Sequence, residues 1–455
     1  MELISINPAN HKILESHKEI SDKIINQTID SSHKTFLEWR KKSFSFKSKK
    51  MKDLAELLIQ KKEKLGVLMT QEMGKPIKQS IAEVEKCAWV CEYYADNAEQ
   101  FLSEKEISTN YSKSFISFQP IGIVLAIMPW NFPLWQVFRF ASPALMAGNV
   151  GILKHASNVQ RCAKEIEKLF LEAGFPKSSL SNLVIGSKKV SNIIKNPLVR
   201  AITLTGSTPA GKAVASLAGS LLKKTVLELG GNDPYVILED AELNNAVESC
   251  IAGRMLNTGQ SCIAAKRFIV VESRLKEFIN KIKQKIKNMK MGDPVNPDVN
   301  IGPMINNESR EELHQQVLRS VEKGAKLILG GKIPNLKGSF YPPTLLVNVK
   351  PGMAAFDDEL FGPVAVIISA KDEAEAIELA NKTNYGLGAA IFTRDIKKGE
   401  KIATEQLEAG SCFVNDFVKS DPRLPFGGIK ESGYGRELSH FGIQEFVNIK
   451  SVVIQ

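Results

Sequence analysis

Hydrophobic and polar positions repeat with different spacings along the chain. In the first hundred residues apolar side chains recur three and four positions apart, as at Leu54, Leu57, Leu58 and Leu65. Residues with this spacing lie on one face of a helix, so we expect the first hundred residues to be helical. From 112 to 119 polar and apolar residues alternate instead, which predicts an exposed antiparallel strand.

Short apolar runs alternate with helical segments after residue 120. We predict strands at 121–127, 150–153, 183–185, 201–204 and 226–229, and then at 235–238, 268–271, 327–329, 364–368, 389–392 and 412–414. Helical periods fall at 159–173, 275–289 and 374–381. Strands that alternate with helices build mainly parallel, doubly wound sheets, so the predicted fold class is α/β with two such domains.

The first α/β domain is expected to span residues 1–229 and the second residues 230–420. Residues 421–455 would then return along the molecule and end in a strand at 447–454. A terminal strand without a sequential partner often joins the sheet of another subunit. We therefore expect a small β arm, formed with residues 103–120, that holds a homodimer or a homotetramer together.

The composition excludes several classes of protein. Of the 455 residues, 43% are hydrophobic and 24% are charged, which is typical of a globular protein with two or three folded units. The longest apolar stretch, 121–130, is about half of the roughly 20 residues that cross a membrane. The first eight residues lack the basic and apolar segments of a signal peptide. We therefore expect no membrane partner.

The charged and sulfur-containing residues point the same way. The formal net charge is +10, but the lysines of 281–290 fall on the solvated face of a predicted helix, and no nucleic-acid-binding motif is present. The six cysteines form no C-x-x-C pair and the six histidines do not cluster with them. We therefore expect no nucleic-acid partner, no disulfide framework and no metal site. A reduced, cytoplasmic protein fits this composition.

Cys262 is the candidate nucleophile. It ends the small, polar, glycine-containing turn 257–262, directly before an apolar strand, and loops at strand ends often carry reactive groups. The alternative is that Cys262 is a small buried hydrophobic residue. We favour that alternative for Cys87, Cys91 and Cys250, which lie in apolar helical surroundings.

Two further polar residues stand in unusual surroundings. Glu228 is flanked by leucines and followed by two glycines, and burial would raise its pKa and make it a usable base near neutral pH. Asn131 lies in the segment 129–133 after an apolar strand, where its amide could stabilise an oxyanion. The alternatives are a structural salt bridge for Glu228 and a proline-bounded turn for Asn131. The segment 206–211 is a weak candidate for a phosphate-binding turn at a helix start.

The order and spacing of these segments carry more information than any one of them. Six motifs follow one another in a fixed order, Trp-Asn-Phe-Pro at 130–133, Leu-Thr-Gly-Ser at 204–207, Leu-Glu-Leu-Gly-Gly at 227–231, Gly-Gln-Ser-Cys at 259–262, Glu-Leu-Phe-Gly-Pro at 359–363 and Pro-Phe-Gly-Gly-Ile-Lys at 425–430. In this order they resemble the aldehyde dehydrogenase superfamily, over nearly the whole chain. The resemblance implies a cofactor-binding first domain, a catalytic second domain and a β oligomerisation arm.

The resemblance also implies the catalytic roles. Cys262 would attack the aldehyde, Asn131 would stabilise the oxyanion, Glu228 would activate the water that hydrolyses the thioester, and Lys154 would complete the catalytic set. His155 is a rival base, because histidine titrates near neutrality, but in the family's pattern it only neighbours the cofactor lysine. A binding protein that has lost its activity should have damaged Cys262, Glu228 or Asn131, and all three are present.

A nicotinamide cofactor follows from the same resemblance. The implied cofactor-binding residues are Met128, Pro129, Trp130, Asn131, Lys154, Ser157, Gly206, Ser207, Gly211, Leu229, Glu359 and Phe361. NAD-preferring relatives often carry a glutamate where this chain has Ser157, and a carboxylate there would repel the 2′-phosphate of NADP. We therefore expect NADP or NAD, with NADP favoured.

The substrate side is predicted from one helical face and from the resemblance. Trp135 and Arg139 follow Asn131 at helical spacing, and an arginine binds a carboxylate with two hydrogen bonds. The alternative for Arg139 is a surface or interdomain salt bridge. The chain most resembles the short bacterial-type succinate-semialdehyde dehydrogenases, which implies Ser420 and Phe426 as further substrate-binding residues.

The predicted reaction is therefore the NAD(P)-dependent oxidation of succinate semialdehyde to succinate. A broad-specificity or glutarate-semialdehyde dehydrogenase is the alternative, and the presence of Glu228 argues against a CoA-dependent, acylating enzyme. One position departs from the pattern, because some longer relatives carry a second arginine where this chain has Leu256. Arg254 or Arg267 could compensate for its absence.

Overall fold

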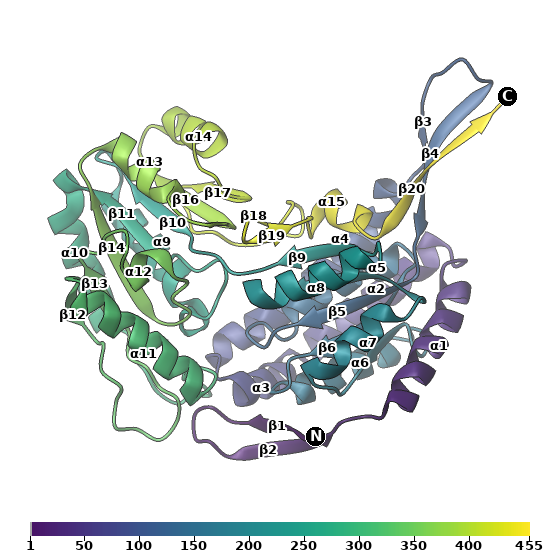
Figure 1. The fold of residues 1–455 in the computed structure, drawn as a ribbon, viewed down its shortest axis with the longest axis horizontal. Coiled ribbons are helices and arrows are strands. Elements are labelled where there is room, and N and C mark those ends of the chain that lie inside the picture. The colour runs from purple at the N-terminus through teal and green to yellow at the C-terminus, as the bar shows by residue number, and fades with distance from the viewer. Residues whose placement is uncertain (1) are drawn as a thin grey trace.

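The computed structural model describes residues 2–455 and contains two α/β domains and a projecting β arm (Figure 1). The first domain is built on a six-stranded sheet and the second on a seven-stranded sheet. The predicted fold class is therefore confirmed. Among the described residues, no helix is both long and apolar enough to cross a membrane.

The sheet of the first domain has the strand order β19-β9-β8-β5-β6-β7. All neighbouring strands are parallel except β19 and β9. The strands are β5 (Ile123–Met128), β6 (Val150–His155), β7 (Leu180–Asn182), β8 (Val199–Thr205), β9 (Lys224–Glu228) and β19 (Gly433–Tyr434). Four of the five predicted strands are found, but the one expected at 183–185 lies three residues earlier, as β7.

Helices cover this sheet on both faces, as a doubly wound fold requires (Figure 1). They are α1 (Asp22–Trp39), α2 (Phe44–Gln60), α3 (Lys62–Met73), α4 (Ile77–Phe101), α5 (Trp135–Met146), α6 (Gln160–Glu172), α7 (Val190–Lys195) and α8 (Thr208–Ser220). Every residue of α5 is buried, because this helix packs against α4, the sheet and α2. The helix α5 matters for function because it follows Asn131 and carries Trp135 and Arg139.

The sheet of the second domain has the order β12-β13-β14-β11-β10-β16-β17, and only β12 is antiparallel to its neighbour. Its strands are β10 (Pro234–Ile237), β11 (Arg267–Val271), β12 (Lys326–Leu329), β13 (Thr344–Val347), β14 (Val364–Ala370), β16 (Gly388–Phe392) and β17 (Ser411–Val414). Its helices are α9 (Leu243–Met255), α10 (Glu272–Lys287), α11 (Asn307–Glu322), α12 (Ala354–Asp357), α13 (Glu373–Asn381) and α14 (Ile396–Glu405). The sequence analysis did not predict β13.

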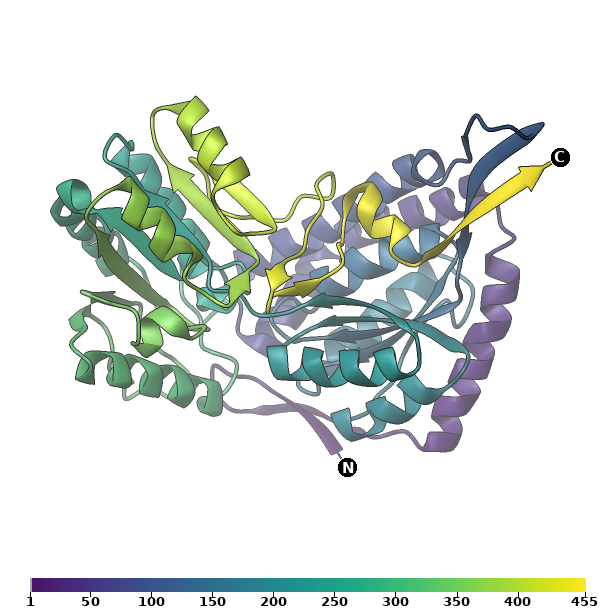
Figure 2. The same ribbon diagram turned by 45° about the horizontal axis from the view of Figure 1, so that its top comes forward.

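The β arm has the strand order β20-β4-β3 and projects from the body of the molecule (Figures 1 and 2). Its strands are β3 (Lys105–Glu106), β4 (Lys113–Pro120) and β20 (Val447–Ile454). Residues 447–454 were expected to form a strand of this arm together with residues 103–120. β20 pairs with β4 of the same chain along all eight of its residues.

Residues 2–18 are not helical, contrary to the sequence-based expectation. They form an antiparallel hairpin of β1 (Glu2–Ile6) and β2 (Ile13–Lys18), which runs along the lower edge of the molecule in Figure 1. The turn of this hairpin reaches the second domain, where the Ser339 amide donates to the Pro8 carbonyl at 2.8 Å. The hairpin therefore connects the two domains away from the main crossing of the chain.

The segment after residue 420 returns to the first domain. It contains β18 (Ile429–Lys430), which pairs with β15 (Tyr385–Gly386) of the second domain, then β19, and then α15 (Ser439–Gln444). Because β18 and β19 bind strands of different domains, this return segment closes the groove between the domains on one side.

Candidate active site

Cys262 lies in the loop between a 3-10 turn, η2 (Leu256–Gly259), and β11. Asn257, Thr258 and Gly259 have φ angles of 54°, 57° and 73°. Left-handed backbone is costly for residues with a Cβ atom, so three such residues in a row need support from their surroundings. At Gly259 even a Cβ is excluded, because it would lie 2.3 Å from the Gly362 carbonyl oxygen. The loop before Cys262 therefore has a fixed shape.

Asn131 is bonded to this loop at two atoms and to α5 at a third. Its Nδ2 donates to the Gln260 carbonyl at 3.0 Å, and its Oδ1 accepts from Gln136 Nε2 at 3.0 Å. Its main-chain oxygen accepts from Asn257 Nδ2 at 2.8 Å. The amide of Asn131 is thus held in one orientation, and it lines the same cavity as Cys262.

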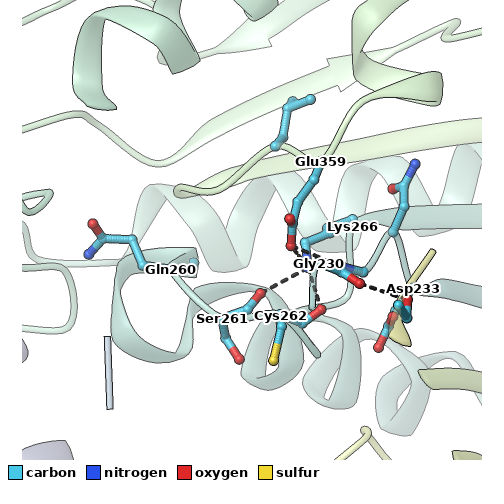
Figure 3. Close-up of polar contacts among 12 residues, drawn as sticks. Gly230, Asp233, Gln260, Ser261, Cys262, Lys266 and Glu359 are labelled. Atoms are coloured by element: carbon cyan, nitrogen blue, oxygen red, sulfur yellow. Dashed lines mark hydrogen bonds and ion pairs between the residues drawn. The ribbon is translucent and has the colours of Figure 1, made fainter. Parts of the chain in front are cut away.

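Lys266 supports the nucleophile loop from the other side (Figure 3). Its Nζ donates to the carbonyl oxygens of Ser261 at 2.9 Å and Cys262 at 2.5 Å, and it lies 3.0 Å from Glu359 Oε1. The same Glu359 oxygen accepts from the Gly231 amide at 3.2 Å. One buried lysine therefore connects the Cys262 loop to the residue expected to bind the cofactor ribose.

The surroundings of Cys262 set the protonation of its thiol. Burial raises the pKa of the thiol to about 12, and the carboxylates of Glu359 and Glu228 also raise it. The positive charges of Lys266 and Arg139 lower it. Because the thiolate is the nucleophile, a proton must leave Cys262 before it attacks.

Glu228 is the last residue of β9 and is 1% exposed. Among residues 2–455, neither of its carboxylate oxygens has a hydrogen-bond partner. Burial raises the pKa of Glu228 well above its ordinary value, the nearby Glu437 raises it further, and Arg139 lowers it. Two cavities meet at Cys262, and Glu228 lines neither of them. Its charge nevertheless raises the pKa of the Cys262 thiol.

Arg139 is buried, and its guanidinium forms an ion pair with the buried Glu437. It also donates to Thr205 Oγ1 at 3.4 Å and stacks over the Phe426 ring at 4.7 Å. Sequence analysis left open whether Arg139 lies on the substrate cavity or forms a salt bridge, and in the structure it does both. Its charge is therefore already balanced by Glu437.

His155, the rival base, is fully buried at the end of β6. Its Nδ1 accepts from the Ala156 amide at 2.9 Å, so its Nε2 carries the proton that it donates to the Pro133 carbonyl at 2.8 Å. Burial lowers the pKa of His155 to about 4. Both ring nitrogens are occupied, so His155 has no free atom with which to accept a proton from substrate or water.

One cavity lies on the cofactor side of Cys262. Trp130 and Phe361 form one of its walls with their rings perpendicular and their centroids 5.9 Å apart. Gly206 and Ser207 lie where α8 begins, and no side chain of α8 or its cap bonds to the first helix amides. Free amides at a helix start favour phosphate. The lining also includes Pro129, Asn131, Gln136, Thr205, Leu229, Gly230, Cys262 and Glu359.

The other predicted cofactor residues lie nearby without lining this cavity. Met128 ends β5 and Lys154 lies on the neighbouring strand β6, with Ser157 just beyond it. Ligands of doubly wound sheets bind outside the carboxyl ends of such strands. Burial lowers the pKa of Lys154. Gly211 lies in α8, where a Cβ would come within 2.6 Å of the Leu229 side chain.

A second cavity meets the first at Cys262 and Gln136 and extends between α4, α5 and the loop 417–426. All four predicted substrate residues line it, namely Trp135, Arg139, Ser420 and Phe426. Its wall also contains aromatic and lysine side chains that the sequence analysis did not name, which are Phe132, Phe417, Lys78, Lys86 and Lys419. Most of the exposed lining is apolar, and the wall also carries four cations, which are Lys78, Lys86, Arg139 and Lys419.

Leu256 lines this second cavity, but neither arginine proposed to compensate for it does. Arg254 donates to the carbonyl oxygens of Gly259, Leu360 and Gly362. Arg267 donates to main-chain carbonyls at Asn232, Leu379 and Ala380. Both side chains are fully buried and hold loops together, so the suggestion that Arg254 or Arg267 compensates is wrong.

Three residues of the site were not found by sequence reasoning. Lys266 could have been noticed, because a lysine that directly precedes an apolar strand is unusual. Glu437 and Lys86 gave no such signal. Glu437 is 298 residues from its partner Arg139 along the chain, and Lys86 lies in a helix whose other lysines and glutamates are mostly exposed.

Two α/β domains that bring together a partly exposed cysteine, an amide donor and a buried carboxylate define an aldehyde-oxidising dehydrogenase. A model of the aldehyde dehydrogenase family matches residues 2–452. The chain belongs to this family.

Individual relatives cover the whole chain. It is 46% identical over 454 residues to a probable NADP-dependent succinate-semialdehyde dehydrogenase of Synechocystis, with all of both chains covered. It is 44% identical to the NAD(P)-dependent succinate semialdehyde dehydrogenase of Escherichia coli, with 99% of this chain and 97% of the other covered. The crystal structure of the Streptococcus pyogenes succinic semialdehyde dehydrogenase with NADP matches with a TM-score of 0.97 at 35% identity, and 99% of each chain is covered.

Proposed function

We propose that this enzyme oxidises succinate semialdehyde to succinate, with NADP as the favoured acceptor and NAD as the alternative. One observation carries the proposal. Cys262 stands where two cavities meet, and the cavity on the substrate side is lined by positively charged side chains and by Ser420. A four-carbon aldehyde with a distal carboxylate suits a cavity whose wall is mostly apolar but also carries cations. Relatives from three organisms carry this activity in their names.

The carbon–sulfur bond forms at Cys262. Its thiolate attacks the aldehyde carbon and gives a thiohemiacetal, whose oxygen carries the negative charge. The Asn131 amide, held in place by Gln136 and Gln260, is the side-chain donor for this oxyanion. One such donor typically contributes about 3 kcal/mol to the barrier.

A bound nicotinamide would supply the acceptor for the hydride that leaves the thiohemiacetal carbon, and the loss of this hydride leaves a thioester on Cys262. Trp130, Phe361, Glu359 and the amides at the start of α8 fit such a cofactor, because the cavity joins aromatic walls, a carboxylate and a helix start. Ser157 leaves room for a 2′-phosphate that a carboxylate would repel. Lys154 lies on β6, the neighbour of β5, and is the positively charged side chain among the proposed cofactor-binding residues.

Glu228 releases the product. Hydrolysis of the Cys262 thioester needs a base that takes a proton from water, and a carboxylate with a raised pKa does so near neutral pH. Because Glu228 must be deprotonated to act, hydrolysis should become faster as pH rises through its raised pKa. The ion pair of Arg139 and Glu437 lies beside Glu228. Arg139 lowers the pKa of Glu228, and Glu437 raises it.

We also propose that the enzyme is a cytoplasmic homo-oligomer. All six cysteines are free thiols, which suits a reducing compartment. The projecting arm exposes the side chains of Ile449, Val453 and Ile454 on β20, and exposed apolar rows commonly mark protein interfaces.

Initial rates of NADPH and NADH formation test the substrate and the cofactor together. Succinate semialdehyde is compared with butanal, which has the same chain length and no carboxylate, and with glutarate semialdehyde. We expect kcat/KM for succinate semialdehyde to exceed that for butanal by roughly 100-fold, since two charge-assisted hydrogen bonds are gained. Equal values for succinate semialdehyde and butanal would contradict the proposal and leave a broad aldehyde dehydrogenase. A preference for glutarate semialdehyde would support the alternative substrate.

A further inference from the structure

Lys86 lies on α4 at the wall of the substrate cavity. Its Nζ donates to Ser420 Oγ at 2.8 Å and stands 4.5 Å from the centre of the Trp135 ring. Ser420 and Trp135 are both expected substrate residues and both line this cavity. Lys86 is thus in direct contact with two side chains that face the substrate.

The other cation of the cavity that is shielded from solvent is already neutralised, whereas Lys78 and Lys419 are exposed. Arg139 forms its ion pair with Glu437, and both side chains are buried. The Arg139 guanidinium is also stacked on Phe426 and bonded to Thr205. A substrate carboxylate that approached Arg139 alone would compete with a carboxylate that is already in contact with it.

Lys86 is free of such competition. Among residues 2–455 it forms no ion pair, although its ammonium group is largely removed from water. The nearest acidic groups are committed elsewhere, because Asp421 is paired with Arg423 and Glu83 with Lys75. A buried cation without a counter-ion is costly unless a ligand supplies the opposite charge.

We propose that Lys86 is a specificity-determining residue, which binds the distal carboxylate of the aldehyde substrate together with Ser420. The inference rests on the proposed function and names the residue that gives it its specificity. An ammonium group has three N–H donors, of which Ser420 uses one. Lys86 supplies from α4 a cation that Leu256, another residue of the cavity wall, cannot provide.

The protonation of Lys86 gives the inference a pH signature. Burial lowers the pKa of Lys86 to about 8, and the charge of Arg139 lowers it further, whereas Cys87, Asp421 and Glu83 raise it. Lys86 is charged below this pKa and neutral above it. Preference for a carboxylate substrate should therefore be full below pH 8 and decline as pH rises through about 8. The ratio of kcat/KM for succinate semialdehyde to that for butanal isolates this effect, because Cys262 and Glu228 act on both substrates.

The experiment measures this ratio between pH 6 and pH 10 (roughly the span in which a lysine with a lowered pKa titrates) for wild type, Lys86→Met and Lys86→Arg. Lys419→Met is the matched control, since Lys419 lines the same cavity but is already paired with Asp416. We expect Lys86→Met to lower the ratio by roughly 30-fold at pH 7, as expected for a lost hydrogen bond to a charged group, and to flatten its pH dependence. Lys86→Arg should retain most of the ratio and flatten its decline, because arginine stays charged.

The outcomes separate this inference from the proposed function. A wild-type ratio near one at pH 7 would overturn the proposed function itself. A large wild-type ratio that Lys86→Met leaves intact would overturn the role of Lys86 and keep the function. If Lys86→Met does not fold, the pH profile of Lys86→Arg decides, because a profile that still declines near pH 8 would exclude Lys86 as the titrating group. An effect of Lys419→Met equal to that of Lys86→Met would show that any cation at the cavity suffices and would also contradict the inference.

Discussion

At the scale of single residues, the proposed nucleophile Cys262 and the proposed base Glu228 both have raised pKa values. Burial raises the pKa of Cys262 and that of Glu228. Glu359 and Glu228 raise the pKa of Cys262 further, and Glu437 raises that of Glu228. Lys266 opposes this effect at Cys262, and Arg139 opposes it at both groups. The balance keeps the resting thiol neutral, so oxidation and alkylation of Cys262 should be slow until the pH is high.

The contribution of Lys266 to this balance can be measured by alkylation. The experiment uses a Cys412→Ser background, which removes the other partly exposed thiol. Iodoacetamide should modify Cys262 at a rate that still rises at about pH 9, where an ordinary thiol titrates, because the pKa of Cys262 is raised. Lys266→Met removes a positive charge, so the thiol pKa should rise and alkylation should slow by roughly tenfold at each pH below it. A rate that Lys266→Met leaves unchanged would show that Lys266 only supports the loop.

Single residues also show what the sequence could reveal. Cys262, Glu228 and Asn131 stand in local contexts that suggested chemistry, and the structure brings the Asn131 amide and the Cys262 thiol to one cavity. Lys86 could not be predicted, because its role depends on Ser420, which is 334 residues away. No local pattern distinguishes a lysine that faces a cavity from one that faces solvent.

At the scale of secondary-structure elements, the start of α5 is held by a carboxylate from another helix. Glu83 on α4 accepts from the amides of Leu134 at 3.0 Å and Trp135 at 2.9 Å, which no residue of α5 caps. The same carboxylate pairs with the fully buried Lys75, whose ammonium group lies 3.8 Å from the centre of the Phe132 ring. The helix that carries Trp135 and Arg139 therefore takes its position from α4.

Glu83→Gln should weaken both interactions. It leaves the buried charge of Lys75 without a partner, and breaking a buried ion pair from one side costs about 3 kcal/mol or more of unfolding free energy. Denaturant unfolding measures this loss, and kcat should fall along with it because α5 moves. Removing both charges in Lys75→Met/Glu83→Gln should recover part of the stability. A double variant less stable than Glu83→Gln would contradict the account of this pair.

Most elements followed from periodicity, and the exceptions have physical causes. The strand β1 was missed because its inward residues are Leu3 and Ser5, while Ile4 and Ile6 are exposed. Ser5 is buried because its hydroxyl donates to Glu72, an interaction that no hydrophobic pattern contains. The strand β20 was predicted at its exact residues, but pairing with β4 depends on contacts between distant parts of the chain.

At the scale of the whole molecule, the two sheets place the chemistry where the chain crosses between domains. The first domain contributes Glu228 at the end of β9 and Asn131 after β5, and the second contributes Cys262 before β11 and Glu359 before β14. Arg254 and Lys266 tie these loops together through main-chain carbonyls and Glu359. Relative movement of the domains would therefore move the nucleophile with respect to both cavities.

The arm gives a second prediction at this scale. Ile449 and Val453 on β20 are 59% and 51% exposed and lie on one face of the strand. Replacing both with lysine should keep the pairing with β4 but lower the mass of the assembly in sedimentation velocity, because an apolar contact surface is lost. Asn448→Lys, on the opposite face, is the control. If the variant with lysine at both Ile449 and Val453 has the same mass in sedimentation velocity as wild type, the interface lies elsewhere.

The central claim is that Cys262 carries the substrate as a thioester until Glu228 hydrolyses it. The most direct test mixes the Glu228→Gln enzyme with succinate semialdehyde and NADP, quenches the mixture and measures the intact mass and the modified peptide. We expect one burst of NADPH per site, slow turnover reduced by roughly a factor of 100 or more, and one succinyl group on the peptide that contains Cys262. Cys262→Ser should show no adduct. NADPH formation without a succinyl group on Cys262, or with the group on another residue, would contradict the claim.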